Sequence, residues 1–337
     1  MPNKNQSEIG GPYSKDNSRI VAWNDPAVAG MRVRDTQGAA QSHCGLGLVA
    51  QMSQRNLICH LYPRAAGGHW RSTVHHLLAR WQQFDGKKTV AIACDPTTDS
   101  PEEVATEFGD AANEITFIPF CNTHLQEVQG ITPLLESVQH APGITLYCHG
   151  KGATHLDPAA ASHAWRDTMA AACLDYPSLV DCCLKDAGIC GTFRSMQPIA
   201  TSPAQWHFAG TWFWFRNDLL FSKNWWDFEV SFWGVESYPG GPGRFQKHES
   251  RCLFFDNAQT GHLYHPWFWR KTLGPAFRTW RERLAKCGEL PLCADPPLSE
   301  LMCELLAPER KEKSCSAVTT STGFWSRARS FLSIPTS

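Results

Sequence analysis

Between residues 56 and 193, short apolar runs alternate with amphipathic segments, and this pattern restricts the possible folds more than any other feature of the sequence. We predict strands at 56–62, 88–94, 115–120, 143–148 and 189–193. We predict helices at 69–84, 101–108, 125–139 and 159–185, the last broken near Pro177. Apolar strands that alternate with helices are typical of a mostly parallel sheet covered by helices on both faces. The sequence therefore predicts an α/β fold.

The ends of the predicted strands indicate where a ligand would bind. In open α/β sheets, ligands occupy the crevice beyond the carboxyl ends of the strands. This rule places the residues that follow Tyr62, Cys94, Phe120 and Cys148 around one crevice.

Composition narrows the class of protein. The chain has 337 residues and a formal charge of −1, which argues against nucleic acid as a partner. No apolar run reaches the roughly 20 residues of a membrane span, so we predict a cytoplasmic protein with no transmembrane segment. None of the 14 cysteines forms a C-x-x-C motif, and we expect reduced, buried thiols rather than a structural zinc site.

The chain is expected to have three parts. Residues 1–54 read as a partly disordered N-terminal extension, because they are rich in Asn, Gln, Ser and Gly. The globular part, 55–285, divides into 55–195, with the strand–helix alternation, and an aromatic-rich half at 196–285. Residues 286–337, interrupted by prolines and charges, read as a largely irregular tail.

The most informative segment follows the fourth predicted strand and contains His149, Gly150, Lys151, Gly152 and Thr154. The glycines let backbone N–H groups approach an anion closely. His149 and Lys151 alternate, so both can converge on one phosphate or diphosphate. The segment is not a P-loop, because G-x-x-x-x-G-K-[ST] is absent. An ordinary glycine-rich turn with a solvated lysine is the alternative.

Asp95 lies at the end of the second predicted strand and faces the expected crevice. It is a candidate contact to a ligand. Its alternative role is local, because Asp-Pro sequences start turns and Asp99 with Ser100 caps the next helix.

Nine of the 14 tryptophans lie between Trp206 and Trp280. Alternation across Phe208–Arg216 predicts a strand on which Trp212 and Trp214 share one face. Glu236 follows among aromatic and turn residues, where a carboxylate tends to have the raised pKa of a general acid or base. The alternatives are an aromatic core and a paired structural glutamate.

These segments together resemble a family of GT-A-type glycosyltransferase-like proteins known largely from bacterial sequences. The resemblance runs from about Asn56 to His265, about 60 per cent of the chain. It rests on the segments HLYP (60–63), FDGKKTVAIACD (84–95), LYCHGKGAT (146–154), WRDTM (165–169), HFAGTWFWFRND (207–218), GVESYPG (234–240) and CLFFDN (252–257). The pairing of H-x-K-G with a later aromatic segment is more specific than either alone.

The resemblance implies a GT-A-like, Rossmann-type sheet and a hexosyltransferase that moves a sugar from a nucleoside diphosphate sugar to a carbohydrate acceptor. The implied catalytic residues are Glu236 as base, with Lys151 and His149 at the leaving diphosphate. The implied donor-binding residues are Asp95, Tyr62, Gly150, Gly152, Thr154 and Arg216. The implied acceptor-binding residues are His207, Trp212, Trp214 and Tyr238.

One position departs from the family pattern. GT-A enzymes commonly carry Asp-x-Asp after the fourth strand, where it holds a divalent metal, and this chain has His149-Gly150-Lys151. A cation there can neutralise the leaving diphosphate directly. We therefore expect no obligatory metal, with Mn²⁺ or Mg²⁺ a possible addition.

Two rival functions follow from the same residues. A non-catalytic carbohydrate-binding or scaffold protein on a degenerate transferase fold would bind sugar without nucleotide. A hydrolase using Cys148 and His149 is disfavoured, because neighbours on a strand point to opposite faces.

Overall fold

A computed structural model of the chain describes residues 54–123, 127–151, 160–199, 202–231 and 233–307. The chain divides into two units, Met1–Leu306 and Ala307–Ser337, and the elements below all belong to the first. The predicted extension 1–54 lies outside the described residues except for Gln54.

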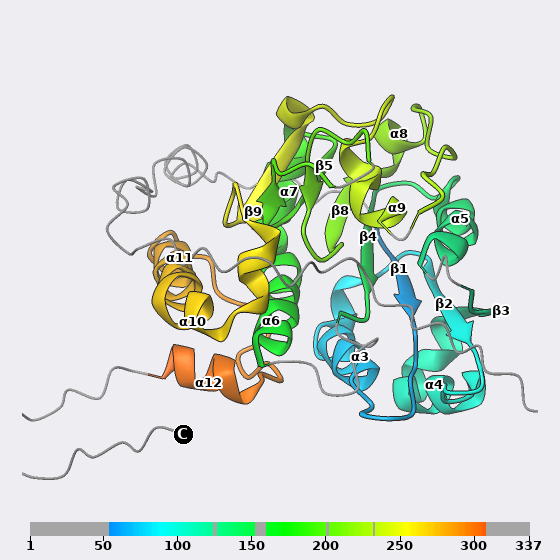
Figure 1. Ribbon diagram of the computed structural model, residues 1–337, viewed down its shortest axis with the longest axis horizontal. Coiled ribbons are helices and arrows are strands. Elements are labelled where there is room, and N and C mark those ends of the chain that lie inside the picture. Colours follow the sequence, from blue (N-terminus) through cyan, green and yellow to red (C-terminus); the bar gives the residue numbers. More distant parts are fainter. Residues whose placement is uncertain (1–53, 124–126, 152–159, 200–201, 232, 308–337) are drawn as a thin grey trace, which may run out of the picture. The chain divides into compact units, whose positions relative to one another are not determined.

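A seven-stranded mixed sheet runs through the first unit (Figure 1). Its order is β3-β2-β1-β4-β8-β5-β9. Only β8 is antiparallel to its neighbours, and a separate hairpin pairs β6 with β7. The strands are β1 (Arg55–Leu61), β2 (Lys88–Cys94), β3 (Thr116–Cys121), β4 (Ile144–His149), β5 (Ile189–Thr192), β6 (Arg194–Ser195), β7 (His207–Phe208), β8 (Phe213–Arg216) and β9 (Ser250–Phe254).

Helices lie on both faces of this sheet. They are α3 (Trp70–Leu78), α4 (Pro101–Phe108), α5 (Glu127–Val138), α6 (Ala160–Leu174), α7 (Pro177–Lys185), α8 (Asn217–Leu220), α9 (Gly234–Ser237), α10 (Pro266–Phe268), α11 (Gly274–Lys286) and α12 (Glu300–Leu306). Shorter helical turns used below are η1 (Trp81–Gln83) and η5 (Thr260–Tyr264).

The alternation of side chains along β1 separates two hydrophobic cores. Leu57, Cys59 and Leu61 pack with α3, α4 and α6 in the larger core. Ile58, on the opposite face, packs with α5 and with aromatic residues of the C-terminal half. Because both faces are buried, the strands need apolar residues at nearly every position. The predicted α/β class, with a mostly parallel sheet flanked by helices and an aromatic-rich C-terminal half, is confirmed.

Local sequence signals explain several element boundaries. Ser100 accepts a hydrogen bond from the Glu103 backbone, and the Glu103 carboxylate returns one to Ser100, which forms the expected capping box with Pro101 at the first helical position. The helix predicted at 69–84 is shorter, because α3 ends at Leu78 and the turn η1 follows.

The strand predicted across Phe208–Arg216 is wrong. Backbone φ angles of +91° at Gly210 and +55° at Thr211 break it into β7 and β8. A Cβ atom at Gly210 would lie 2.5 Å from Met169 Sδ, so glycine is required there both for its φ angle and for space.

Part of the predicted tail is ordered. Helix α12 buries Leu301, Met302 and Leu305 in the larger core. In the part of the chain that the structure describes, no helix combines the length and apolar character needed to cross a membrane.

Candidate functional site

The strand order places a topological switch between β1 and β4. Successive strands run outward from β1 to β3, and the chain then returns to the other side of β1 with β4. Crevices at such switch points, beyond the carboxyl ends of the strands, are where open α/β sheets bind ligands. His60 and His149 pair in register at this end, and the Gly150 N–H donates to the His60 carbonyl at 3.2 Å.

A chain of contacts holds the His149 ring at the switch point. His149 Nδ1 lies 3.0 Å from Glu127 Oε2 at the start of α5. On the other side of the ring, His149 Nε2 lies 3.2 Å from Thr211 Oγ1. Tyr147 O–H donates to the second Glu127 oxygen at 2.6 Å. Burial alone would raise the pKa of Glu127, but the neighbouring His149, with His60 and the Tyr147 hydrogen bond, lowers it to about 2.

The turn that carries Thr211 is strained. A positive φ is rare for a β-branched residue, and such outliers cluster at functional sites. The conformation brings the Thr211 hydroxyl against His149, and the next residue, Trp212, donates its ring N–H to the His149 carbonyl at 2.9 Å. The β7–β8 turn therefore fixes the residue that begins the glycine-rich segment.

Glu236 approaches the same place from α9. Burial raises the pKa of Glu236, and the nearby Lys151 and His149 partly offset this by lowering it. Its Oε1 has no hydrogen-bond partner among the described residues, although His207 Nε2 lies 3.8 Å away. A carboxylate oxygen that is unpaired in a mostly buried position is suited to accept a hydrogen bond from a ligand hydroxyl.

Two neighbouring histidines are kept neutral by burial. Burial lowers the pKa of His207 to about 4, and it lowers the pKa of His60 to about 4 with a further contribution from His149. His207 Nε2 also lies 3.2 Å from Thr260 Oγ1 in η5. The described residues offer no partner to His60 Nε2.

Lys151 has an unusual environment for a lysine. Its Nζ lies 3.9 Å from the centre of the Trp165 ring and 5.4 Å from that of Tyr264. These are cation–π contacts, which leave the ammonium hydrogens able to bind an anion. Within the described ranges, no carboxylate forms an ion pair with Lys151.

Tyr62 and Asp95, both expected to contact the donor, form a second group at the ends of β1 and β2. Tyr62 O–H and Asn122 Nδ2 donate to Asp95 Oδ2 at 2.8 and 2.9 Å. Thr97 donates to the other oxygen with its backbone and its hydroxyl. Burial would raise the pKa of Asp95, but these hydrogen bonds hold it well below its ordinary value. Asp95 is therefore ionised and organises its own turn, which is the local role that the sequence offered as the alternative.

Three aromatic residues expected to bind the acceptor are buried. Trp212 and Trp214 have no exposed surface and belong to the larger core, where Trp214 stacks on Phe84. The Tyr238 ring stacks on Phe228 at 4.4 Å and has the Arg244 guanidinium 4.3 Å from its centre. The prediction that these rings stack on a sugar is wrong, because protein atoms already cover them. His207, the fourth residue in that group, lies beside Glu236.

Arg216 does not join the predicted donor site. Strand β8 is antiparallel to β4, and Arg216 pairs with Ile144 at the amino end of β4, whereas His149 is at its carboxyl end. The Arg216 side chain binds Asp218 instead. The expectation that Arg216 belongs to the donor-binding residues is therefore wrong. Gly152 and Thr154 lie outside the described residues.

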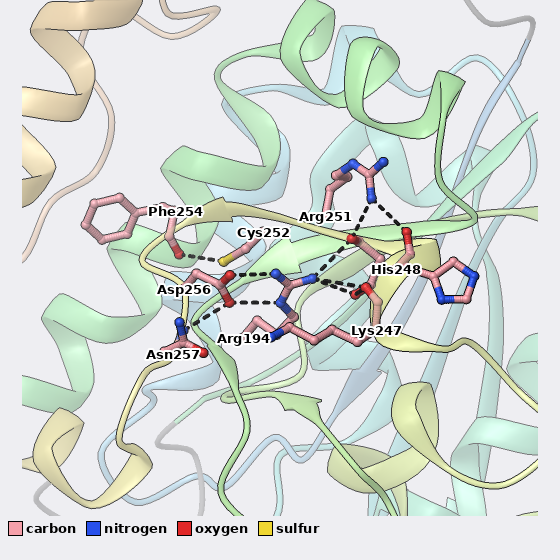
Figure 2. Close-up of polar contacts among 9 residues, drawn as sticks. Arg194, Lys247, His248, Arg251, Cys252, Phe254, Asp256 and Asn257 are labelled. Atoms are coloured by element: carbon pink, nitrogen blue, oxygen red, sulfur yellow. Dashed lines mark hydrogen bonds and ion pairs between the residues drawn. The ribbon is translucent and has the colours of Figure 1, made fainter. Parts of the chain in front are cut away.

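A divalent metal does not fit the residues at the end of β4. The position holds His149, whose ring is engaged by Glu127 and Thr211, and the cationic Lys151. Asp256, which follows β9 at the same end of the sheet, accepts two hydrogen bonds from the Arg194 guanidinium, which balances its charge (Figure 2). Among the described residues, no three His, Cys, Asp or Glu side chains come together as a metal site.

Of the predicted residues, the structure brings together His149, Lys151, Glu236 and His207, and it adds Glu127, Thr211 and Tyr264, which the sequence did not indicate. Glu127 begins a helix that follows β3, and nothing in its local sequence connects it with β4. Thr211 carried one usable signal, because it directly follows a glycine within an aromatic run.

No family model matches the chain, and no curated protein matches it. Among solved structures, the chain is similar to the mannosyltransferase PcManGT from Pyrobaculum calidifontis in complex with GDP-Man and Mn²⁺. The sequence identity is 14% and the TM-score is 0.35, over 80% of this chain and 76% of that chain. The similarity is remote.

Proposed function

We propose that this protein is a glycosyltransferase that binds a nucleoside diphosphate sugar at the β1–β4 switch and transfers the sugar to an acceptor hydroxyl. The observation that carries the proposal is the proximity of Lys151 to Glu236, without an ion pair between them among the described contacts. An ammonium group free of carboxylate partners among the described residues lies close enough to affect the pKa of a mostly buried carboxylate. Both sit where an open α/β sheet binds its ligand.

Lys151 is the proposed contact to the leaving diphosphate. The bond from the sugar to the diphosphate breaks with its electron pair on the phosphate oxygen, and a nearby ammonium stabilises that charge. Both ring nitrogens of His149 contact protein side chains. We therefore assign His149 to hold the glycine-rich turn in place and to contribute to the electrostatic potential at the site. Gly150 N–H is bonded to His60 and is not a phosphate donor in this arrangement.

Glu236 is the proposed general base. If the reaction inverts the anomeric centre, the acceptor hydroxyl must lose a proton as its oxygen attacks, and the unpaired Oε1 can accept that proton. The raised pKa makes Glu236 a stronger base than an exposed glutamate. His207, neutral and 3.8 Å away, supplies a polar neighbour for the acceptor without competing for the proton.

Tyr62 and Asp95 are proposed to border the nucleoside. They lie at the carboxyl ends of β1 and β2, next to the β1–β4 switch, and are joined by a hydrogen bond. The Tyr62–Asp95–Asn122 hydrogen bonds keep this border rigid, and rigid polar groups are suited to orient a base or a ribose.

Calorimetry with UDP and with GDP, followed by turnover assays on a panel of nucleotide sugars, tests the proposal. Each titration is run with EDTA and with MnCl₂, because the residues predict binding without metal. Lys151→Ala is expected to weaken nucleotide binding about tenfold or more, and Glu236→Gln to lower turnover about 10²-fold with nucleotide affinity retained. Absence of nucleotide binding in the unaltered protein would overturn the proposal and favour the non-catalytic sugar-binding alternative.

A further inference from the structure

The burial of Trp212, Trp214 and Tyr238 leaves the proposed acceptor site without the aromatic surface that sugar binding commonly uses. Two aromatic rings of the η5–α10 region are exposed instead. Tyr264 is 38% exposed and Trp267 is 45% exposed. Of the two, Tyr264 is the ring that lies beside Lys151.

Tyr264 is attached to the site from two directions. Its ring meets Trp165 edge to face at 5.2 Å, and Trp165 is the ring that supports Lys151 at 3.9 Å. At the other end of η5, Thr260 contacts His207, which lies 3.8 Å from Glu236. The turn η5 therefore joins the proposed diphosphate contact to the proposed base, and Tyr264 is its exposed ring.

We propose that Tyr264 is the stacking surface for a sugar ring in this site, an inference that rests on the proposed transferase function. A pyranose presents C–H groups on its faces and hydroxyls on its edge, so it packs on an aromatic face while its hydroxyls reach polar neighbours. Tyr264 offers the face, and Glu236 and His207 offer the polar neighbours. Lys151 Nζ lies over the Tyr264 ring at 5.4 Å, and the 38% of Tyr264 that is exposed is available to a ligand.

Trp267 provides a matched control. It is an aromatic residue of similar exposure, three positions further along the chain, and its ring lies beside His262, His265 and Phe268. If exposed aromatic surface were enough, the two rings would behave alike.

The test compares Tyr264→Ala, Tyr264→Phe and Trp267→Ala in the full chain. Methyl glycosides of glucose, galactose and mannose serve as saccharide probes in ligand-observed NMR, and UDP and GDP serve as nucleotide probes in calorimetry. Tyr264→Ala is expected to weaken the bound saccharide roughly tenfold, about 1.4 kcal/mol, with unchanged nucleotide affinity. Tyr264→Phe and Trp267→Ala are expected to bind as the unaltered protein does.

The remaining outcomes separate this inference from the proposed function. Saccharide binding that survives Tyr264→Ala, or that is absent from the unaltered protein, overturns the inference while nucleotide binding still supports a transferase. Weakened nucleotide binding with unchanged saccharide binding also overturns it, because Tyr264 would then only position Lys151. Turnover assays with donor and acceptor varied separately identify the source of the sugar: a raised acceptor KM indicates the acceptor, and a raised donor KM indicates the donor sugar.

Discussion

Two histidine–carboxylate pairs in this protein have the same contact distance and different surroundings. His76 Nε2 lies 3.0 Å from Asp167 Oδ1 between α3 and α6, and both side chains are at most 1% exposed. His149 Nδ1 lies 3.0 Å from Glu127 Oε2 at the carboxyl edge of the sheet, and both side chains are 18% exposed. Distance alone therefore does not distinguish a structural pair from a candidate functional one.

The neighbours of each pair make the distinction. Asp167 also binds Arg166 and the backbone N–H of Ser299, so several elements converge on one buried carboxylate. Burial, reinforced by the charges of Arg80 and Arg166, lowers the pKa of His76 and keeps its ring neutral. Around the edge pair, by contrast, lie a strained Thr211, an ammonium on aromatic rings and a glutamate oxygen without a partner. The side chains around the core pair satisfy its hydrogen bonds. The edge pair lies beside groups that can still bind a ligand.

The largest effect is expected from breaking the core pair. Asp167→Ala removes the carboxylate that Arg166, His76 and Ser299 share and leaves a buried guanidinium without it. The free energy of unfolding is expected to fall by about 3–5 kcal/mol. Urea denaturation followed by tryptophan fluorescence measures the change. A loss below about 1 kcal/mol would show that the core network does not depend on this carboxylate.

Breaking the edge pair should instead affect function. Glu127→Gln keeps the size of the side chain but removes the charge that holds His149, so turnover is expected to fall about 10- to 100-fold. The loss of stability should be less than half of that caused by Asp167→Ala, because water reaches this pair. Denaturation and turnover are measured on the same preparations.

A third pair supplies the control for Glu127→Gln. His75 Nε2 lies 2.6 Å from Glu107 Oε1 on the surface of α3 and α4, and the His75 side chain is 52% exposed. Glu107→Gln should leave turnover unchanged and cost at most about 1 kcal/mol, as exposed ion pairs do. Equal effects of Glu107→Gln and Glu127→Gln on turnover would remove the distinction between the two positions.

Two buried histidines beside the candidate site should make folding sensitive to acid. The pKa values of His60 and His207 are about 4 in the folded protein, below the ordinary 6.5. Between pH 6.5 and 4 the unfolded chain therefore binds more protons, and the free energy of unfolding falls as the pH falls, by up to about 1.4 kcal/mol per pH unit for each histidine. Above pH 6.5 their contribution is fully present.

The substitution His207→Gln isolates this effect. Denaturation curves at several pH values between 4 and 7 should show a smaller dependence of the free energy of unfolding on pH than in the unaltered protein. A pH dependence unaffected by His207→Gln would mean that His207 titrates normally in the folded state.

Local sequence patterns predicted the first half of the sheet well and the aromatic half poorly, for a physical reason. Strand β2 begins at Lys88 and ends at Cys94 as predicted, because its apolar run is bounded by charged and turn residues, and α4 begins where its capping box lies. The alternation around Trp212 and Trp214 was genuine, but both faces of this sheet are buried. Alternation separates two faces and does not say which of them meets solvent.

The residues of the candidate site that directly follow a strand could be predicted from the sequence. His149 and Lys151 follow β4 directly, and the rule that ligands bind beyond the carboxyl ends of strands identified them. Glu127 begins helix α5, which is distant from β4 in sequence. Its contact with His149 is a tertiary contact that no local sequence pattern predicts. The prediction for Arg216 is wrong because the residues of β8 do not indicate that this strand is antiparallel to β4. The last residue of an antiparallel strand lies at the amino end of its neighbour.

The smallest effect is expected at Arg216, which tests whether position rather than charge defines the site. Arg216 and Lys151 are both cations near β4, but Arg216 lies at its amino end and pairs with Asp218, whose side chain is 61% exposed. Arg216→Ala should change stability by at most about 1 kcal/mol and should leave the affinity for UDP and GDP unchanged, because the lost charge is on the far side of the sheet. Lys151→Ala, measured in the same calorimeter, should weaken nucleotide binding. If both substitutions weakened nucleotide binding equally, binding would depend on the overall charge of the protein. The carboxyl ends of the strands would then not be the nucleotide-binding site.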